Sequence, residues 1–343
     1  MISTSEAKQL ILDKCKPLSV TELPLSKLSN EVLAADVKNK TDSPPFHQSA
    51  MDGYAIRFDD TKSFTHFKLT GEVIAGKANT QKLMKGTAMR IFTGAEVPVG
   101  ADTVVMQEHT IPEKKGLLLT QLSMLKMGAN IRVKGSQIKR GQIALPTGHL
   151  LNAASIGYLA MLGIDKAKIY KRPSVGIIAT GNELQLPGKP LSGSQIYESN
   201  TITLQALLAE MHFAKVAAKR VRDNEAFIVT TLKKALNSYD VLLITGGISV
   251  GDYDLVAPVL KKIGVKTIFH KVAQKPGKPF LFGTKGKKLI FALPGNPAAV
   301  ITCFLQYVKP ALQKMMGYPS IDISSFMAVS KMILAKKQDS PIF

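Results

Sequence analysis

Three segments in the second half of the chain repeat one pattern, in which a short apolar run leads into a turn rich in glycine or proline and then into a helix. The apolar runs occupy residues 175–180, 241–245 and 289–293. The helices are expected at about 200–211, at about 255–263 and up to about 313. Short, continuously apolar strands that alternate with helices are typical of a parallel sheet covered on both faces. We therefore predict a doubly wound α/β domain over residues 169–317.

The first half of the chain has a different organisation. Ser3 and Glu6 have the spacing of a capping box, which predicts a short N-terminal helix. A second helix is predicted over residues 25–36, where apolar residues recur at helical spacing. Residues 53–141 are rich in glycine, threonine and short alternating runs, which indicates a β-rich domain built as a barrel or a sandwich. Asn152 is expected to cap a further helix.

Two of the turns that follow the apolar strands have the composition of an anion site. Ligands on a doubly wound sheet bind at the carboxyl ends of its strands, where all three turns must lie. The second turn offers close backbone approach and a hydroxyl through Gly246, Gly247, Ser249 and Gly251. The third turn opens a helix, whose first amides favour an oxyanion, with Pro294, Gly295, Asn296 and Pro297. Neither turn is a Walker or dinucleotide fingerprint. Such glycines can serve tight turns alone, but three turns at one edge favour a ligand site.

Acidic residues are expected at the same edge of the sheet. Each follows a strand or its turn: Glu183, Asp223, Asp252 and Asp254. Carboxylates that converge beside an oxyanion site are the ligands that a hard divalent cation prefers. The sequence therefore predicts a magnesium site there.

A lysine-rich segment supplies the opposite charge. Lys271, Lys275 and Lys278 lie on a stretch bracketed by Pro276 and Pro279. A charge run is ordinarily a solvated face, but prolines and a glycine at this spacing favour a shaped loop. Three lysines on such a loop can neutralise several anionic oxygens at once.

The net charge of +20, from 45 basic and 25 acidic residues, favours anionic partners or reflects a lysine-rich proteome. Arg-Gly repeats and aromatic residues interleaved with basic ones are both missing, so a nucleic-acid-binding module finds no support. Cys15 and Cys303 rule out a disulfide framework and favour a cytoplasmic, reducing compartment. No signal peptide and no apolar run long enough for a membrane span occur, so no membrane partner is expected.

The segment Ser49-Ala50-Met51-Asp52-Gly53-Tyr54-Ala55 resembles the signature of the molybdopterin molybdenumtransferase family, which inserts molybdenum into the pterin dithiolene. The order and spacing of the other motifs extend the resemblance over roughly residues 1–320. These motifs are Phe92-Thr93-Gly94-Ala95, Thr180-Gly181-Asn182-Glu183-Leu184, the 246–251 turn with Asp254, the 271–279 loop and the 293–297 turn. The combination is specific, although the Gly-Gly turn and the 293–297 turn also occur in related pterin- and nucleotide-binding domains.

The resemblance implies a reaction in which adenylylated molybdopterin and molybdate are substrates and AMP leaves in a Mg²⁺-dependent step. It implies catalytic roles for Asp52, Thr93, Glu183, Asp223, Asp254, Lys271 and Lys275. It implies ligand binding by Gly246, Gly247, Ser249, Gly251, Lys278, Pro294, Gly295, Asn296 and Pro297. The implied magnesium ligands are Glu183, Asp223 and Asp254. It further implies a homodimer in which Asp52 acts on the partner's site, and molybdopterin adenylyltransferase as the upstream partner.

By the same resemblance the chain is a multidomain α/β protein: a molybdopterin-binding domain, a β-rich insertion and a small helical linker domain. The predicted domains are 1–40 with 142–168 (linker and dimerisation), 41–141 (β-rich), 169–317 (α/β) and 318–343 (the start of a C-terminal β-domain that is otherwise missing). Ser136 and Gln137 stand where the family has two carboxylates. That replacement and the short C-terminus favour an alternative, a non-catalytic molybdopterin-binding or carrier protein of the same fold.

Overall fold

The computed structural model describes residues 1–77, 80–114, 116–214, 216–248 and 255–321. The chain divides into two units. One comprises Met1–Ala35, Thr147–Ile156 and Lys166–Phe343, and the other comprises Asp36–Pro146 and Gly157–Asp165. Within the described ranges, no helix is both long and apolar enough to cross a membrane.

The first unit is built on a six-stranded sheet with strand order β16-β13-β17-β20-β19-β18. Its strands are β13 Val175–Thr180, β16 Ala217–Val221, β17 Val241–Thr245, β18 Lys266–His270, β19 Leu281–Lys285 and β20 Lys288–Leu293. The three predicted strands, β13, β17 and β20, are adjacent and parallel, and β16 extends them in parallel. β18 and β19 were not predicted, and β19 runs antiparallel to both of its neighbours, β18 and β20. Only Gly286 and Lys287 join β19 to β20, and a two-residue connection permits only an antiparallel pair.

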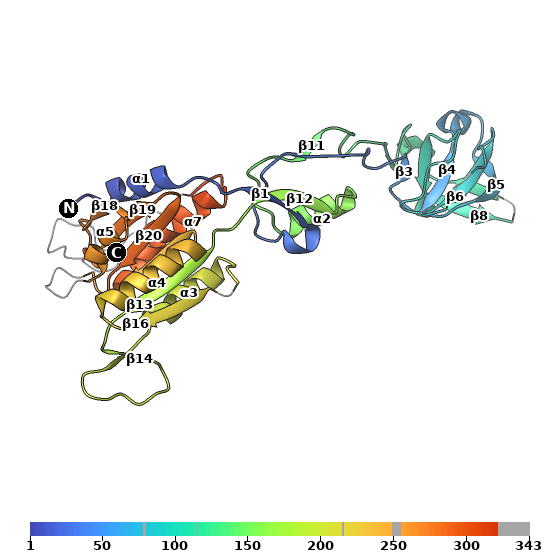
Figure 1. Ribbon diagram of the computed structural model, residues 1–343. Coiled ribbons are helices and arrows are strands. Elements are labelled where there is room, and N and C mark those ends of the chain that lie inside the picture. The colour runs from blue at the N-terminus through green and yellow to red at the C-terminus, as the bar shows by residue number, and fades with distance from the viewer. Residues whose placement is uncertain (78–79, 115, 215, 249–254, 322–343) are drawn as a thin grey trace, which may run out of the picture. The chain divides into compact units, whose positions relative to one another are not determined.

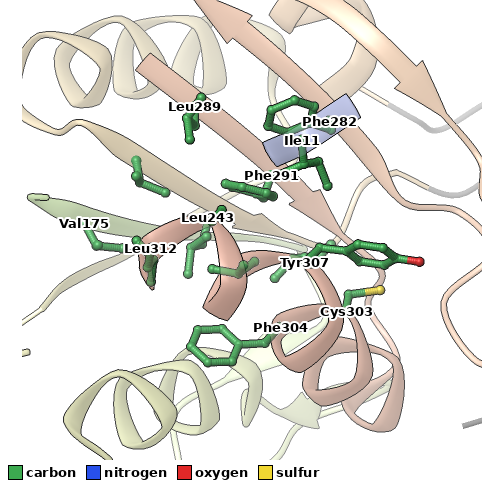
Figure 2. Close-up of a cluster of buried hydrophobic side chains, with 14 of the residues drawn as sticks. Ile11, Val175, Leu243, Phe282, Leu289, Phe291, Cys303, Phe304, Tyr307 and Leu312 are labelled. Carbon is green, nitrogen blue, oxygen red and sulfur yellow. The ribbon is translucent and has the colours of Figure 1, made fainter. Parts of the chain in front are cut away.

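Each face of this sheet is covered by its own helices, because successive side chains of a strand point to opposite faces. One cluster joins Val175, Leu243 and Phe291 to α1, α3, α6 and α7 (Figure 2). The other joins Ile178 and Ile244 to α4 and α5. Figure 1 shows these helices beside the strands of the sheet. The helices are α1 Thr4–Lys14, α3 Asn200–Glu210, α4 Glu225–Ser238, α5 Val256–Lys262, α6 Pro297–Cys303 and α7 Lys309–Met315, with a π-helical stretch at Phe304–Val308. The doubly wound architecture is thus confirmed.

The predicted helix over residues 25–36 is wrong. Only Leu25–Lys27 forms a 3₁₀ turn, and Asn30 has a left-handed φ of 61° that ends helical geometry. The apolar Val32 and Leu33 instead form bridges with Leu150 and Ile169. Nearby, β1 Val20–Pro24 pairs antiparallel with β12 Lys166–Tyr170. The apolar residues that suggested a helix are therefore part of a short extended segment, in which the same side chains are buried.

Both predicted helix caps are present. The Ser3 hydroxyl accepts a hydrogen bond from the Glu6 amide at 3.1 Å, at the start of α1. The Asn152 side chain accepts one from the Ser155 amide at 2.9 Å, at the start of α2 Ala153–Met161. Each cap satisfies one of the amides that a helix leaves without a partner in its first turn.

The second unit contains the predicted β-rich region as one mixed six-stranded sheet of order β7-β4-β6-β5-β9-β8. Its strands are β4 Gly53–Ile56, β5 His66–Val73, β6 Thr87–Ile91, β7 Thr103–Met106, β8 Thr110–Glu113 and β9 Gly116–Leu119. Hydrophobic clusters lie on both of its faces, one with Tyr54 and Ile56 and the other with Ala55. The remaining short strands are β2 Val37–Lys38, β3 Gln48–Ser49, β10 Ile131–Arg132 and β11 Ile143–Leu145 here, and β14 Leu184–Gln185 and β15 Ile196–Tyr197 in the first unit.

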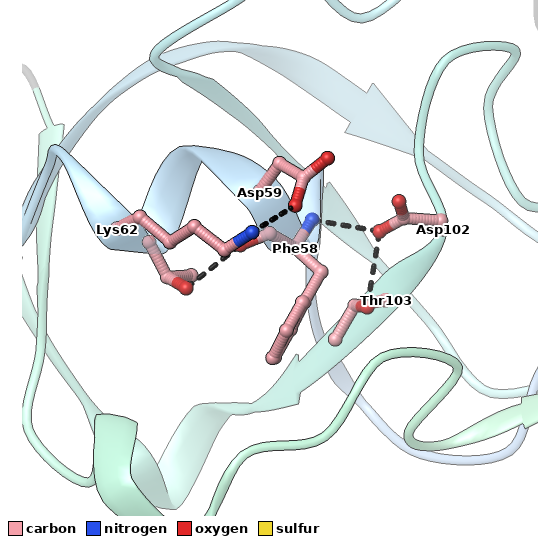
Figure 3. A network of polar contacts seen from close by, with 6 residues as sticks. Phe58, Asp59, Lys62, Asp102 and Thr103 are labelled. Atoms are coloured by element: carbon pink, nitrogen blue, oxygen red, sulfur yellow. Dashed lines mark hydrogen bonds and ion pairs between the residues drawn. The ribbon is translucent and has the colours of Figure 1, made fainter.

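One carboxylate fastens a 3₁₀ helix, Phe58–Lys62, to this sheet (Figure 3). Asp102 accepts a hydrogen bond from the Phe58 amide at 2.7 Å and another from the Thr103 hydroxyl at 3.0 Å. Asp59 and Lys62 form an exposed ion pair on the same turn at 2.9 Å, which contributes little because both groups remain solvated.

Candidate active site

The turns after β13 and β17 lie against each other at the carboxyl edge of the first unit's sheet. Gly246 and Gly247 have φ values of 85° and 60°, which favour glycine. A Cβ on Gly246 would lie 2.3 Å from the Thr180 carbonyl oxygen, and one on Gly247 would lie 2.8 Å from the Thr180 hydroxyl. Both glycines are therefore required by local packing, whatever they bind. The predicted residues Ser249, Gly251, Asp252 and Asp254 lie outside the described residues.

A residue that the sequence interpretation missed, Asn200, links these turns to the one after β20. Its side-chain amide donates to the Thr245 hydroxyl and to the Gly295 carbonyl, both at 2.9 Å. Two buried oxygens at this edge, Thr180 Oγ1 and Asn200 Oδ1, have no partner within the described ranges. Buried polar groups are normally paired, so these two oxygens leave hydrogen-bonding capacity at this edge that the described residues do not use. The signal in the sequence was an asparagine at the first position of a helix.

The predicted turn after β20 is positioned as a helix start. Asn296 caps α6, because its side chain accepts a hydrogen bond from the Ala299 amide at 3.2 Å. Pro297 occupies the first helical position, where its missing N–H costs nothing. A Cβ on Gly295 would meet nothing within 4 Å. Local packing therefore does not explain this glycine, and the space above it is open to a ligand. Pro294 accepts a hydrogen bond from the Thr245 hydroxyl at 3.3 Å.

Two of the predicted acids lie on adjoining turns. Asp223 and Asn182 bond reciprocally: the Asp223 amide donates to the Asn182 side chain at 3.1 Å, and the Asn182 amide donates to the Asp223 carboxylate at 3.2 Å. Glu183 folds over Gly181, since a Cβ there would lie 2.8 Å from both of its carboxylate oxygens. Partial desolvation raises the pKa of Asp223 although its side chain is exposed, and the negative charge of Glu183 adds to the increase.

The loop of residues 271–279, called the lysine loop below, lies at the same edge of the sheet. It follows His270 at the end of β18, which pairs with Leu281, and Leu281 in turn pairs with Ala292, near the end of β20. Lys275 and Lys278 are exposed, and Lys271 is half-buried. Within the described residues none of the three lysines has an ion-pair partner. Their charges are available to a ligand.

The base of the lysine loop is braced from the core. Gln274, which is 3% exposed, donates to the Pro276 carbonyl at 3.0 Å and accepts a hydrogen bond from the Tyr307 hydroxyl. Figure 2 shows the Tyr307 hydroxyl and the Cys303 sulfur pointing the same way from neighbouring helical turns. A Cβ on Gly277 would lie 2.4 Å from the Gln274 amide nitrogen and 2.8 Å from the Cys303 sulfur. The shaped loop expected from the sequence therefore has a buried anchor.

Asp52 and Thr93, predicted from the resemblance, lie together in the second unit. Asp52 accepts hydrogen bonds from the Thr93 amide at 2.8 Å and from its hydroxyl at 2.7 Å. These bonds, with the nearby Arg90 charge, lower the pKa of Asp52. Arg90 is itself held 5.0 Å over the rings of both Tyr54 and Phe92. Asp52 is therefore an ionised carboxylate in a fixed position.

Ser136 and Gln137, which stand where the family has two carboxylates, lie in the same unit. Gln137 accepts a hydrogen bond from the Ser43 hydroxyl at 2.9 Å, and both Ser136 and Gln137 are exposed. No group of three or more histidine, cysteine, aspartate or glutamate side chains within the described ranges is arranged to hold a metal ion. Glu183 and Asp223 are two of the three predicted magnesium ligands, and the third lies outside those ranges.

The fold and this edge define a class: a multidomain α/β protein whose strand ends combine tight glycine turns, carboxylates and lysines. Residues 2–163 match the MoeA N-terminal region (domain I and II), and residues 176–314 match the probable molybdopterin binding domain. The molybdopterin molybdenumtransferase of Haemophilus influenzae is 35% identical over 318 residues, 92% of this chain and 78% of that protein. The one from Nostoc is 37% identical over 297 residues, 84% of this chain and 68% of that protein. The chain belongs to the molybdopterin molybdenumtransferase family.

A solved structure supports the same assignment. The molybdopterin biosynthesis MoeA protein from Pyrococcus horikoshii superposes with a TM-score of 0.80 at 33% sequence identity. The match covers 94% of this chain and 81% of that one. The predicted family and the predicted multidomain α/β class are thus confirmed.

Proposed function

We propose that this chain inserts molybdate into adenylylated molybdopterin and releases AMP. The names of its relatives support the transferase activity. The observation that carries the proposal is the set of three lysines on a braced loop at the carboxyl edge of the sheet, which have no ion-pair partner in the part of the chain that the structure describes. A substrate with a pyrophosphate and a pterin phosphate, and the molybdate dianion, both require such positive charge.

The residues divide the work by their chemistry. Lys271, Lys275 and Lys278 bind anionic oxygens as charged hydrogen-bond donors, which are stronger than neutral ones. Gly295 leaves room for backbone approach. Because Gln274 anchors the backbone of the loop from the core, the loop is held before substrate arrives, and less ordering entropy is lost on binding.

Glu183 and Asp223 fit magnesium by donor type, since both offer exposed carboxylate oxygens on adjoining turns. We assign these two residues, with Asp254, to holding the ion. A bound magnesium ion would offset phosphate charge as AMP leaves. The raised pKa of Asp223 suits a carboxylate that awaits a cation, because a nearby positive charge would lower it again.

We further propose that the protein works as a homodimer in the cytoplasm and receives its substrate from molybdopterin adenylyltransferase. The two cysteines are buried and unpaired, which suits a reducing compartment. We assign Asp52 and Thr93 to the reaction together, as an ionised carboxylate held by the neutral hydroxyl and the amide of Thr93.

The test is to incubate the purified protein with adenylylated molybdopterin, molybdate and magnesium, and to follow AMP release. Release that depends on molybdate supports the transferase. Binding of the pterin with no release in any condition would instead identify the non-catalytic carrier.

The replacement Ser136→Glu with Gln137→Asp tests whether the neutral pair limits the rate. The two carboxylates would add negative charge, which attracts a divalent cation and repels molybdate. We expect faster AMP release at low magnesium concentration. A double variant that is no faster and needs as much magnesium would show that the neutral pair is not limiting.

A further inference from the structure

A polar cavity of about 380 Å³ lies beside the carboxyl ends of β16 and β13. This size falls within the roughly 300–1,000 Å³ of small-molecule sites. Its lining includes Asn182, Leu184, Gln185, Gln195, Arg220 and Arg222. None of these side chains belongs to the lysine loop or to the predicted site residues.

Two arginines define the charge of this cavity. Arg220 is the penultimate residue of β16 and Arg222 follows its last residue, so the two lie on the same side of the extended chain. Arg220 donates one hydrogen bond to the Leu184 carbonyl at 2.6 Å, which fixes its guanidinium. The Arg222 guanidinium has no partner within the described residues.

The hydrogen bonds of the other lining residues leave mainly donors for a ligand. The Asn182 side-chain oxygen already accepts from the Asp223 amide. The Gln195 oxygen accepts from the Ser192 amide at 3.1 Å and from its hydroxyl at 3.0 Å. The oxygen of Gln185 accepts from the Leu186 amide at 2.9 Å. What remains is two guanidinium groups and side-chain amide N–H groups, a set that matches an oxyanion.

Two features narrow the ligand further. The negative charges of Glu183 and Asp223 lie on the adjoining turns and repel an anion. Binding of an anion here therefore needs both arginines, or a divalent cation, to offset that repulsion. Leu184 is the only apolar side chain among those lining the cavity, and no aromatic ring is present for a base to stack on. A phosphate with a hydroxyl-rich group attached fits better than a purine.

We propose that this cavity binds the phosphate–ribose half of the nucleotide in the substrate, with Arg222 as its principal ligand. The assignment of a nucleotide rests on the proposed function. The anion specificity rests on the donor set alone.

The test uses calorimetric titration of the full chain at low salt with AMP, ribose 5-phosphate and adenosine, each with and without magnesium. AMP and ribose 5-phosphate should bind with dissociation constants within a fewfold of each other, and adenosine at least tenfold more weakly. Arg222→Gln should weaken both phosphates about tenfold or more, which corresponds to about 1.4 kcal/mol. Because the Arg222 side chain is exposed and has no hydrogen-bond partner within the described residues, the variant should fold, and its thermal melt checks this.

Lys219→Gln is the matched control, since Lys219 neighbours Arg220 on β16 but lines a different cavity, under α4. It removes the same charge and should leave both affinities within twofold. Equal losses in the two variants, or none in Arg222→Gln, would overturn the proposal. Equal affinity for AMP and adenosine would do so too. The titration needs no turnover, so an Arg222-dependent phosphate site in a protein that releases no AMP would retain this inference and refute the proposed function instead.

Discussion

Replacing Tyr307 with phenylalanine isolates the brace beneath the lysine loop. Phenylalanine keeps the ring, which stacks on Phe280 at a centroid distance of 4.8 Å. The change removes only the hydroxyl that donates to Gln274. Burial raises the pKa of Tyr307 well above its ordinary value, so this group is a protonated donor throughout the working pH range.

The loss leaves a buried acceptor without a partner. Tyr307 is 1% exposed and Gln274 is 3% exposed, so water cannot simply replace the hydroxyl. An unsatisfied buried group costs about 1–3 kcal/mol, and we expect the free energy of unfolding to fall by that amount in urea titrations. Because the loop base loosens, KM for adenylylated molybdopterin should rise more than kcat falls.

Tyr318→Phe is the control, because its hydroxyl makes no hydrogen bond within the described residues. It should change the unfolding free energy by less than about 0.5 kcal/mol. Combining Tyr307→Phe with Gln274→Leu should cost less than the sum of the single changes, because both act on one bond. Full additivity, or an unchanged KM in Tyr307→Phe, would refute the brace.

The remaining predictions concern charge, assembly and the cysteines. Lys275→Ala should weaken binding of adenylylated molybdopterin by about 1.5–3 kcal/mol; unchanged affinity at low salt, measured by titration, would exclude the oxyanion role. Mixing Asp52→Ala chains with Glu183→Ala chains should restore part of the AMP release if a dimer shares its sites, whereas mixed dimers without activity would show that it does not. Burial raises the pKa of Cys15 and Cys303 to about 12, so at pH 8 thiol reagents should label neither until the chain unfolds. The free energy of unfolding should therefore fall as the pH rises above about 9 toward 12, because the thiols of the unfolded chain ionise before those of the folded one.

The sequence predicted the parallel strands well because their signal is local. β13 and β17 are buried along their whole length, and β20 is buried from Leu289 to Leu293, whereas the fourth parallel strand, β16, is mostly exposed and was not predicted. β18 and β19 were missed because their apolar runs are short: only Ile268 and Phe269 in β18, and only Leu281 and Phe282 in β19. Periodicity also failed over residues 25–36. There Asn30 has a left-handed backbone that ends helical geometry, and the apolar residues Val32 and Leu33 form backbone β-bridges instead.

The candidate site was predictable in its charges but not in its supports. Lysines, acids and glycine turns carry a pattern that a sequence shows directly. Asn200, Gln274 and Tyr307 act by holding other groups, and the bonds from Asn200 to Gly295 and from Tyr307 to Gln274 join residues 95 and 33 positions apart. No local spacing marks such residues, because the fold alone brings them to the turn or loop that they hold.

The glycines of the three turns show how steric evidence separates structure from function. A Cβ would collide with Thr180 at Gly246 and Gly247, so packing accounts for both, whereas at Gly181 it would meet the carboxylate end of the exposed Glu183 side chain and the Leu184 Cγ. Gly295 is different: its backbone is not left-handed and a Cβ there would meet nothing. Packing among the described residues leaves this glycine unexplained, while the Asn200 side chain donates a hydrogen bond to its carbonyl. Because sterics account for the glycines of the turn after β17 but not for Gly295, the turn after β20 is the one whose glycine we assign to ligand binding.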